Sequence, residues 1–203
     1  MKIGVLALQG AFREHIEMLR GLGVETIEVR LPEQLRDLDG LIIPGGESTT
    51  IGKVATQYNL IEPLREFVAQ GKPVWGTCAG MIVLAKDVSM AGHAVMRQPL
   101  VGVMDVRVKR NAFGRQVDSF ETDLDIPEIQ NGDKTPFHAI FIRAPLFETV
   151  NANVRVLAKL DDGTIVAARE NNLLATSFHP ELTRDPRFHQ YFLNMVQAAR
   201  GTA

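Results

Sequence analysis

Apolar and polar residues alternate along the first part of the chain in two different rhythms. Short apolar or alternating segments have the pattern of strands at residues 3–8, 25–30, 39–43 and 73–76. Residues 11–22 and 60–70 instead place apolar side chains at helical spacing. Strands that alternate with helices predict a largely parallel central sheet with helices on both faces, which is a three-layer αβα, flavodoxin-like architecture.

The second half of the chain follows a different pattern, with little helical spacing. Strands are predicted at residues 101–109, 116–124, 137–142, 154–160, 164–169 and 173–178. The signal Asp161-Asp162-Gly163 joins two of them as a hairpin, so we expect some antiparallel strands beside the parallel ones. Residues 125–136 are polar and turn-rich and are expected to form a mobile loop. Asp185-Pro186 opens a last helix that ends near Ala199.

The composition limits the class of protein. The chain has 203 residues, 45% of them hydrophobic and 23% charged, so we expect one soluble domain over residues 1–203. The net charge of −2 gives no field that would gather nucleic acid or an anionic membrane. The apolar run at residues 3–8 is too short for a signal peptide or a membrane span, and one cysteine cannot form an internal disulfide. A cytoplasmic location is therefore expected.

The single cysteine lies between a predicted strand and a predicted helix. The stretch Gly76-Thr77-Cys78-Ala79-Gly80 is a cysteine version of the G-x-S-x-G elbow, which exposes a nucleophile on a sharp turn. Its glycines leave room for the turn because they carry no β-carbon. Cys78 is therefore a candidate nucleophile. A redox-sensing thiol and an inert structural thiol are the alternatives.

A cysteine nucleophile needs a base, and His179 is the best-placed histidine. It lies at the carboxyl end of a buried strand, where doubly wound folds gather their sites. Glu181, two residues on, would face the same way in an extended segment and orient the imidazole. A capped strand end is the alternative. His15 is expected to be an ordinary surface residue on the first helix, and His93, His138 and His189 give no catalytic signal.

The stretch Pro44-Gly45-Gly46-Glu47-Ser48 is a candidate oxyanion hole. It follows a strand and precedes a helix at residues 48–58, and its glycines let backbone N–H groups turn inward. Gly46 would supply one donor and Ala79, the residue after the nucleophile, the other. A tight turn with a helix cap at Ser48 or Thr49 is the alternative. The spacing fits neither of the common phosphate-binding glycine motifs.

Together, the cysteine elbow and His179-Pro180-Glu181 resemble the triad glutamine amidotransferases. Within these enzymes, the chain is similar over nearly its whole length to the family of glutaminase subunits of pyridoxal 5′-phosphate synthase. Further stretches carry this resemblance: Gly4-Val5-Leu6-Ala7-Leu8-Gln9-Gly10, Pro44-Gly45-Gly46-Glu47-Ser48-Thr49-Thr50, Arg110-Asn111-Ala112-Phe113-Gly114-Arg115-Gln116, Phe141-Ile142-Arg143-Ala144-Pro145 and Ser177-Phe178-His179-Pro180-Glu181-Leu182. Residues 88–99 correspond least, and nothing is inferred from them.

The resemblance implies a role for each matching residue. Cys78 is the nucleophile, His179 the base and then the acid, and Glu181 the orienting carboxylate. Glutamine binding falls to the Gly46-Glu47-Ser48 turn, Arg110, Ile142 and Arg143. Gln9, at the end of the first strand, is implied as a gate or an extra donor near the oxyanion site. Without the resemblance, Arg110 and Arg143 would be taken for surface charges.

The implied reaction is hydrolysis of L-glutamine to L-glutamate and ammonia, and none of its steps requires a metal or cofactor. The implied partner is a synthase subunit that uses the ammonia to make pyridoxal 5′-phosphate, in a hetero-oligomeric complex. One alternative is a glutaminase subunit that serves another pathway, such as imidazole glycerol phosphate synthesis. A non-enzymatic redox sensor of the same architecture is the other, and it would have no use for His179 and Glu181.

Overall fold

The computed structural model describes residues 1–90, 98–110 and 119–201. Its main sheet has seven strands in the order β10-β11-β12-β4-β3-β1-β2. Five of them pair in parallel: β1 (Lys2–Leu6), β2 (Glu25–Val29), β3 (Gly40–Ile43), β4 (Val74–Thr77) and β12 (Leu173–Thr176). The other strands are β10 (Arg155–Lys159) and β11 (Ile165–Glu170), and β11 runs antiparallel to both of its neighbours. The sheet is therefore mixed and mostly parallel, as predicted.

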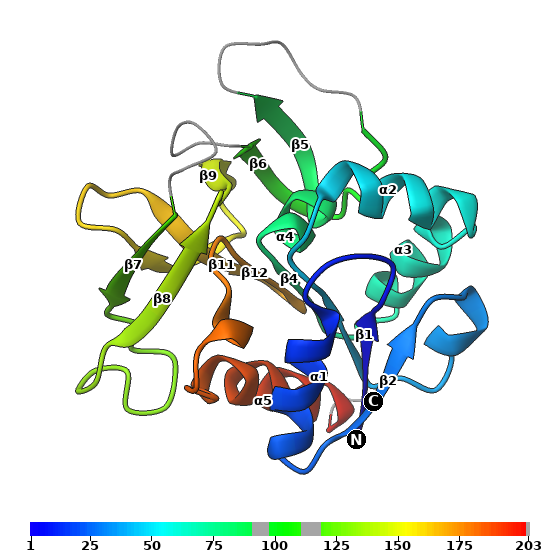
Figure 1. Ribbon diagram of the computed structural model, residues 1–203, viewed down its shortest axis with the longest axis horizontal. Coiled ribbons are helices and arrows are strands. Elements are labelled where there is room, and N and C mark those ends of the chain that lie inside the picture. The colour runs from blue at the N-terminus through cyan, green and yellow to red at the C-terminus, as the bar shows by residue number, and fades with distance from the viewer. Residues whose placement is uncertain (91–97, 111–118, 202–203) are drawn as a thin grey trace.

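Helices cover both faces of this sheet (Figure 1). One face carries α1 (Phe12–Gly21) and α5 (Arg187–Arg200), while α2 (Ser48–Gln57), α3 (Ile61–Ala69) and α4 (Ala79–Leu84) lie on the other. Each face has its own apolar core, because strand residues alternate between the two. Two short 3₁₀ helices, η1 (Pro32–Leu35) and η2 (Pro180–Leu182), lie in connections. No helix among the described residues is long and apolar enough to cross a membrane.

Two smaller sheets extend the molecule beyond the main one. A three-stranded sheet contains β5 (Ala85–Met90), β6 (Met104–Arg110) and β9 (Leu146–Val150), and a hairpin contains β7 (Ser119–Leu124) and β8 (Phe137–Ile142). The sequence predicted β6, β7 and β8 but missed β5 and β9. No glycine or proline separates β5 from α4, and β9 is only five residues long, with Glu148 and Thr149 interrupting its apolar residues. Residues 116–118 of the predicted strand 116–124 lie outside the described residues.

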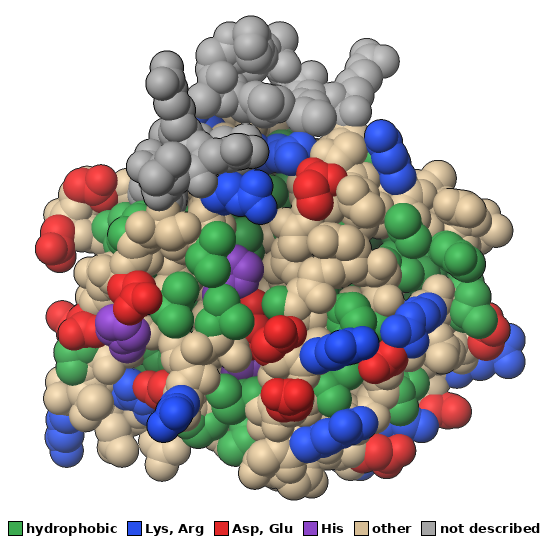
Figure 2. Space-filling model, viewed as in Figure 1, with side chains coloured by type: hydrophobic (Ala, Val, Ile, Leu, Met, Phe, Trp, Pro, Cys, Tyr) green, Lys and Arg blue, Asp and Glu red, His purple; other side chains and the backbone are tan. Residues whose placement is uncertain are grey.

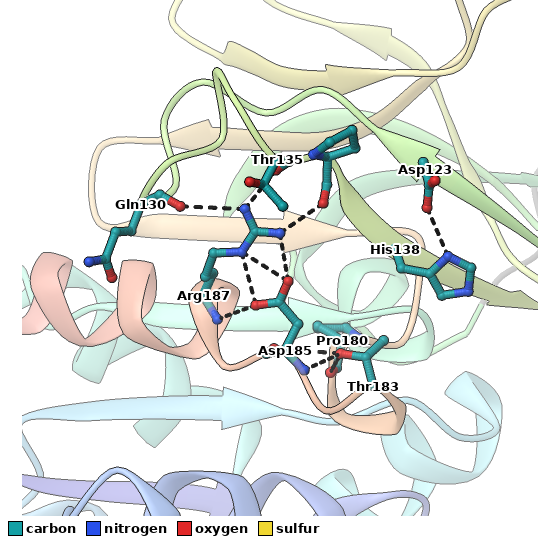
Figure 3. A network of polar contacts seen from close by, with 9 residues as sticks. Asp123, Gln130, Thr135, His138, Pro180, Thr183, Asp185 and Arg187 are labelled. Atoms are coloured by element: carbon teal, nitrogen blue, oxygen red, sulfur yellow. Dashed lines mark hydrogen bonds and ion pairs between the residues drawn. The ribbon is translucent and has the colours of Figure 1, made fainter.

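The segment at residues 125–136 is anchored, whereas the sequence predicted a mobile loop. Its two isoleucines, Ile126 and Ile129, are buried in the core that lies beneath α5. The Arg187 guanidinium forms an ion pair with Asp185, with Nη2 2.6 Å from Oδ2. The same guanidinium donates hydrogen bonds to the backbone carbonyls of Gln130, Thr135 and Pro136 (Figure 3). Apolar residues hidden within a polar stretch are the reason that the composition misled the prediction.

We expect Arg187→Met to lower the free energy of unfolding by about 2 kcal/mol, because several backbone carbonyls and Asp185 lose a charged donor. Hydrogen exchange should accelerate at residues 126–135. The matched control is Arg155→Met, since Arg155 pairs with Glu128 at 2.7 Å but its side chain is 68% exposed. Its cost should stay below about 1 kcal/mol. Equal losses in urea denaturation would show that Arg187 does not anchor this segment.

Candidate active site

Cys78 lies on a strained turn between β4 and α4. Its backbone has φ 48° and ψ −103°, which is uncommon for a residue with a side chain. Two glycines make the turn possible. A β-carbon on Gly80 would lie 1.9 Å from the carbonyl oxygen of Ile43, and one on Gly76 would lie 2.5 Å from the carbonyl carbon of Gly80. The turn is fixed to the sheet because the Cys78 N–H donates to the Thr176 carbonyl at 2.8 Å.

His179 and Glu181 follow β12, the strand next to β4. The Nδ1 atom of His179 is 2.7 Å from Oε1 of Glu181, and both residues are buried. The backbone differs from the extended segment that the sequence predicted, because Glu181 lies within η2. Thr183 Oγ1 donates to the Pro180 carbonyl at 3.0 Å and accepts the N–H of Asp185, which fixes this turn (Figure 3).

The protonation of His179 follows from its two neighbours. Burial alone would lower its pKa, but interactions with Cys78 and Glu181 raise the pKa of His179 to about 10. Glu181 occupies Nδ1, so Nε2 is the ring nitrogen available to Cys78. An imidazolium beside a sulfur favours the thiolate, which is the nucleophilic form. The arrangement thus places an imidazolium beside the sulfur of Cys78, the candidate nucleophile.

The glycine turn after β3 packs directly against both of these groups. A β-carbon on Gly45 would lie 2.4 Å from Cε1 of His179 and 3.4 Å from Cβ of Cys78. The side chain of Gln9 reaches the same turn, where its Oε1 accepts the Glu47 N–H at 2.6 Å. Any side chain at position 45 would collide with the imidazole, so only glycine fits there. The turn therefore packs its backbone directly against Cys78 and the imidazole.

The residue that caps α2 is Glu47, where the sequence favoured Ser48 or Thr49. Its carboxylate accepts the N–H of Thr49 at 3.1 Å and the N–H of Thr50 at 2.7 Å. Although burial acts in the opposite direction, hydrogen bonds from Thr50 and Thr49 lower the pKa of Glu47 to about 2. The Glu side chain is longer than those of the usual cap residues, yet from the cap position it still binds the N–H groups of the first turn. The residue statistics for caps do not anticipate this.

A cavity of about 300 Å³ opens in front of Cys78. Every residue that the sequence analysis placed in the site lines it, except Glu181, which contacts His179. The lining residues are Gln9, Gly46, Glu47, Ser48, Cys78, Ala79, Ile82, Arg110, Ile142, Arg143, Pro145 and His179. Among the described residues, no three His, Cys, Asp or Glu side chains are grouped as metal ligands would be.

Arg110, at the end of β6, forms one wall of the cavity. Its Nη2 lies 3.1 Å from Glu47 Oε1, and its Nη1 donates to Gln98 Oε1 at 2.7 Å and to Thr49 Oγ1 at 3.0 Å. The side chain is only 14% exposed, unlike an ordinary surface charge. Sequence reasoning missed Gln98 because it lies in a segment without a recognisable pattern. Residues 111–116 of the same motif, and His93, lie outside the described residues.

The prediction that His15 is a surface residue was wrong. His15 is fully buried, as is His189 on α5, and the two imidazoles are 2.9 Å apart between Nδ1 and Nε2. Glu14 and Glu17 lie near His15 in sequence, but its own position on α1 faces the sheet. By contrast, His138 is exposed on β8, between Asp123 and Glu121 at 2.9 Å each. No signal in the sequence distinguished the buried His15 from the exposed His138.

A model of the SNO glutamine amidotransferase family matches residues 5–198. The chain belongs to this family. The pyridoxal 5′-phosphate synthase subunit PdxT of Herpetosiphon aurantiacus is 60% identical over 195 residues, which cover 96% of this chain and 100% of that protein. The PdxT subunit of Carboxydothermus hydrogenoformans is 58% identical over 196 residues, which cover 97% and 98% of the two chains.

Two solved structures are similar to this chain. A crystal structure of a glutamine amidotransferase superposes with a TM-score of 0.86 at 50% identity, and covers 96% of this chain and 98% of that chain. The structure of PurLQS from Thermotoga maritima has a TM-score of 0.68 at 17% identity, and the match covers 95% of this chain and 97% of that chain. At this lower identity the likeness concerns the fold alone.

The contact between Gly45 and His179 predicts that Gly45→Ala displaces the imidazole. We expect glutaminase kcat/KM to fall about 100-fold, as for other small misplacements of a reacting group, while the circular dichroism spectrum is unchanged. Gly21→Ala is the matched control, because a β-carbon there meets nothing within 4 Å. Full activity in both variants would mean that the Gly45 contact does not position His179.

Proposed function

We propose that Cys78 hydrolyses L-glutamine to L-glutamate and ammonia, with His179 as base and acid and Glu181 as the orienting carboxylate. One observation carries this proposal. The thiol, an imidazole held by a buried carboxylate and a glycine turn meet at one cavity of about 300 Å³, which is within the range of small-molecule sites. The amidotransferase family to which the chain belongs uses glutamine as its nitrogen source.

In the first half of the reaction, the Cys78 thiolate attacks the carbon of the glutamine side-chain amide. The N–H groups of Gly46 and Ala79 are proposed to bind the developing oxyanion, and one such donor is worth about 3–4 kcal/mol elsewhere. The His179 imidazolium then gives its proton to the leaving nitrogen. Ammonia departs, and a γ-glutamyl thioester remains on the sulfur.

In the second half, His179 takes a proton from a water molecule, which attacks the thioester carbonyl. The carbon–sulfur bond breaks, L-glutamate leaves, and the thiolate and the imidazolium are restored. Glu181 stabilises each imidazolium form, because its Oε1 faces Nδ1 at 2.7 Å. The two half-reactions therefore use the same three side chains.

Glutamine recognition is proposed for the charged wall of the cavity. The substrate carries an α-carboxylate and an α-ammonium, so a selective site needs a cation for one and acceptors for the other. Arg110 and Arg143 provide cations, and Glu47 and the Ile142 carbonyl provide acceptors. Ser48 and the Gly46 turn complete the contacts. Gln9 is proposed as a gate, since its Oε1 already binds the Glu47 N–H.

We further propose that the ammonia passes to a synthase subunit that makes pyridoxal 5′-phosphate, within a hetero-oligomeric cytoplasmic complex. The names of the relatives in Herpetosiphon and Carboxydothermus, which are subunits of that synthase, support this step. Charges of both signs are interspersed on the face shown in Figure 2, without a large area of one sign.

Residues 1–203 are proposed to form one glutaminase domain, in which the parallel order β2-β1-β3-β4-β12 is flavodoxin-like.

The proposed nucleophile is tested with Cys78→Ala. This variant should form no detectable glutamate and should keep the wild-type unfolding temperature within a few degrees. His138→Ala is the matched control, because it removes an exposed imidazole that does not line the cavity. This variant should remain fully active. Glutamate formation by Cys78→Ala at the wild-type rate would overturn the proposed function.

The proposed partner is tested by adding a pyridoxal 5′-phosphate synthase subunit. We expect the rate of ammonia release to rise and the two chains to elute together from a gel-filtration column. The synthase of imidazole glycerol phosphate formation, the alternative partner, should leave the rate unchanged. Activation only by this second synthase would assign the chain to the other pathway.

A further inference from the structure

A second buried polar cluster lies on the far side of Glu181 from His179. Its members are His15 on α1, Thr77 at the end of β4 and His189 on α5, and all three are fully buried. The Nε2 atom of His15 is 3.4 Å from Oε2 of Glu181 and 3.2 Å from Oγ1 of Thr77. None of these three side chains has a role in the reaction described above.

The two oxygens of Glu181 have different environments. Oε1 binds His179, whereas Oε2 is buried and forms no regular hydrogen bond with any described residue. A buried carboxylate oxygen without a donor is costly. The group that faces Oε2 is Nε2 of His15, at a distance slightly beyond that of a short hydrogen bond. A small movement of either side chain would make the contact a full hydrogen bond.

The tautomers of the two histidines follow from both ends of the cluster. If His15 carried its proton on Nδ1, its Nε2 lone pair would face the carboxylate, and the Nδ1–H of His189 would be a buried donor without a partner. With the proton on Nε2 of each ring, His189 donates to Nδ1 of His15, and the unpaired atom is only a lone pair. His15 then presents an N–H to Thr77 and Glu181.

His15 remains neutral in this environment. Burial, followed by the charges of His189 and His179, holds the pKa of His15 well below its usual value, and burial lowers the pKa of His189 to about 3. Among the described residues, these two imidazoles and Glu181 are the titratable groups that face it. A neutral donor can fix a carboxylate without neutralising its charge, which stays available to the catalytic imidazolium.

We propose that His15 is a positioning residue, whose Nε2–H holds Oε2 of Glu181 so that Oε1 stays aligned with His179, and that His189 fixes the tautomer of His15. This inference rests on the proposed function, because it concerns the orientation of the same base. It extends the chain of contacts from the triad through α1 to α5, and it accounts for two buried histidines that the apolar core alone does not require.

Two polar substitutions at His15 separate positioning from packing. The amide nitrogen of His15→Gln can reach the place of Nε2, whereas the shorter amide of His15→Asn reaches only the place of Nδ1, near His189. We expect His15→Asn to lower kcat on the order of tenfold with little change in KM, as for the loss of hydrogen-bond partners behind other active groups. His15→Gln should recover most of the wild-type kcat.

A second readout does not depend on turnover. In a ¹⁵N NMR titration of the full chain, the pKa of His179 should fall in His15→Asn, because a displaced Glu181 stabilises the imidazolium less, and should stay near the wild-type value in His15→Gln. Equal behaviour of the two variants in both measurements would overturn the proposal. An inactive wild-type chain that still shows this NMR difference would instead reject the proposed function and leave the positioning role supported.

Discussion

The backbone of Cys78 is held in a conformation that costs a non-glycine residue about 1–3 kcal/mol, and the surrounding sheet must supply that energy. It does so through β4, which pairs with β3 on one side and β12 on the other. The same pairing places the ends of these three strands side by side. The glycine turn follows β3, the elbow follows β4 and His179 follows β12. The strand order that holds the strained turn therefore also brings together the groups that surround it.

The site is supported from both layers of helices. On one face, α4 begins at the elbow and packs close against β3, because Gly80 meets the carbonyl of Ile43. On the other face, α1 and α5 bring two buried histidines beneath Glu181. Trp75 contributes to this second layer, since its ring lies against both imidazoles and its Nε1–H donates to Thr176. Burying a polar cluster in an apolar core costs desolvation energy. In return, its hydrogen bonds fix the geometry of the groups that it contacts.

The sequence predicted those parts of the molecule in which local rules and tertiary packing agree. Strands β1, β3 and β12 are nearly continuous apolar runs, and the elbow has glycines that its geometry demands, so both were found. The rest depends on contacts between distant segments. Glu47 caps α2 through a reach that cap statistics do not describe, His15 is buried by α5, and Arg187 anchors a segment that looks mobile by composition. Strands β5 and β9 exist because β6 lies between them.

The covalent step at Cys78 can be observed directly. The chain and its synthase subunit would be mixed with radiolabelled L-glutamine, quenched rapidly in acid, digested and analysed by mass spectrometry. We expect the label on the peptide that contains Cys78, as a glutamyl thioester that is released by mild alkali. Rapid glutamate formation with no label on the protein, or a label on another residue, would contradict the nucleophilic role of Cys78.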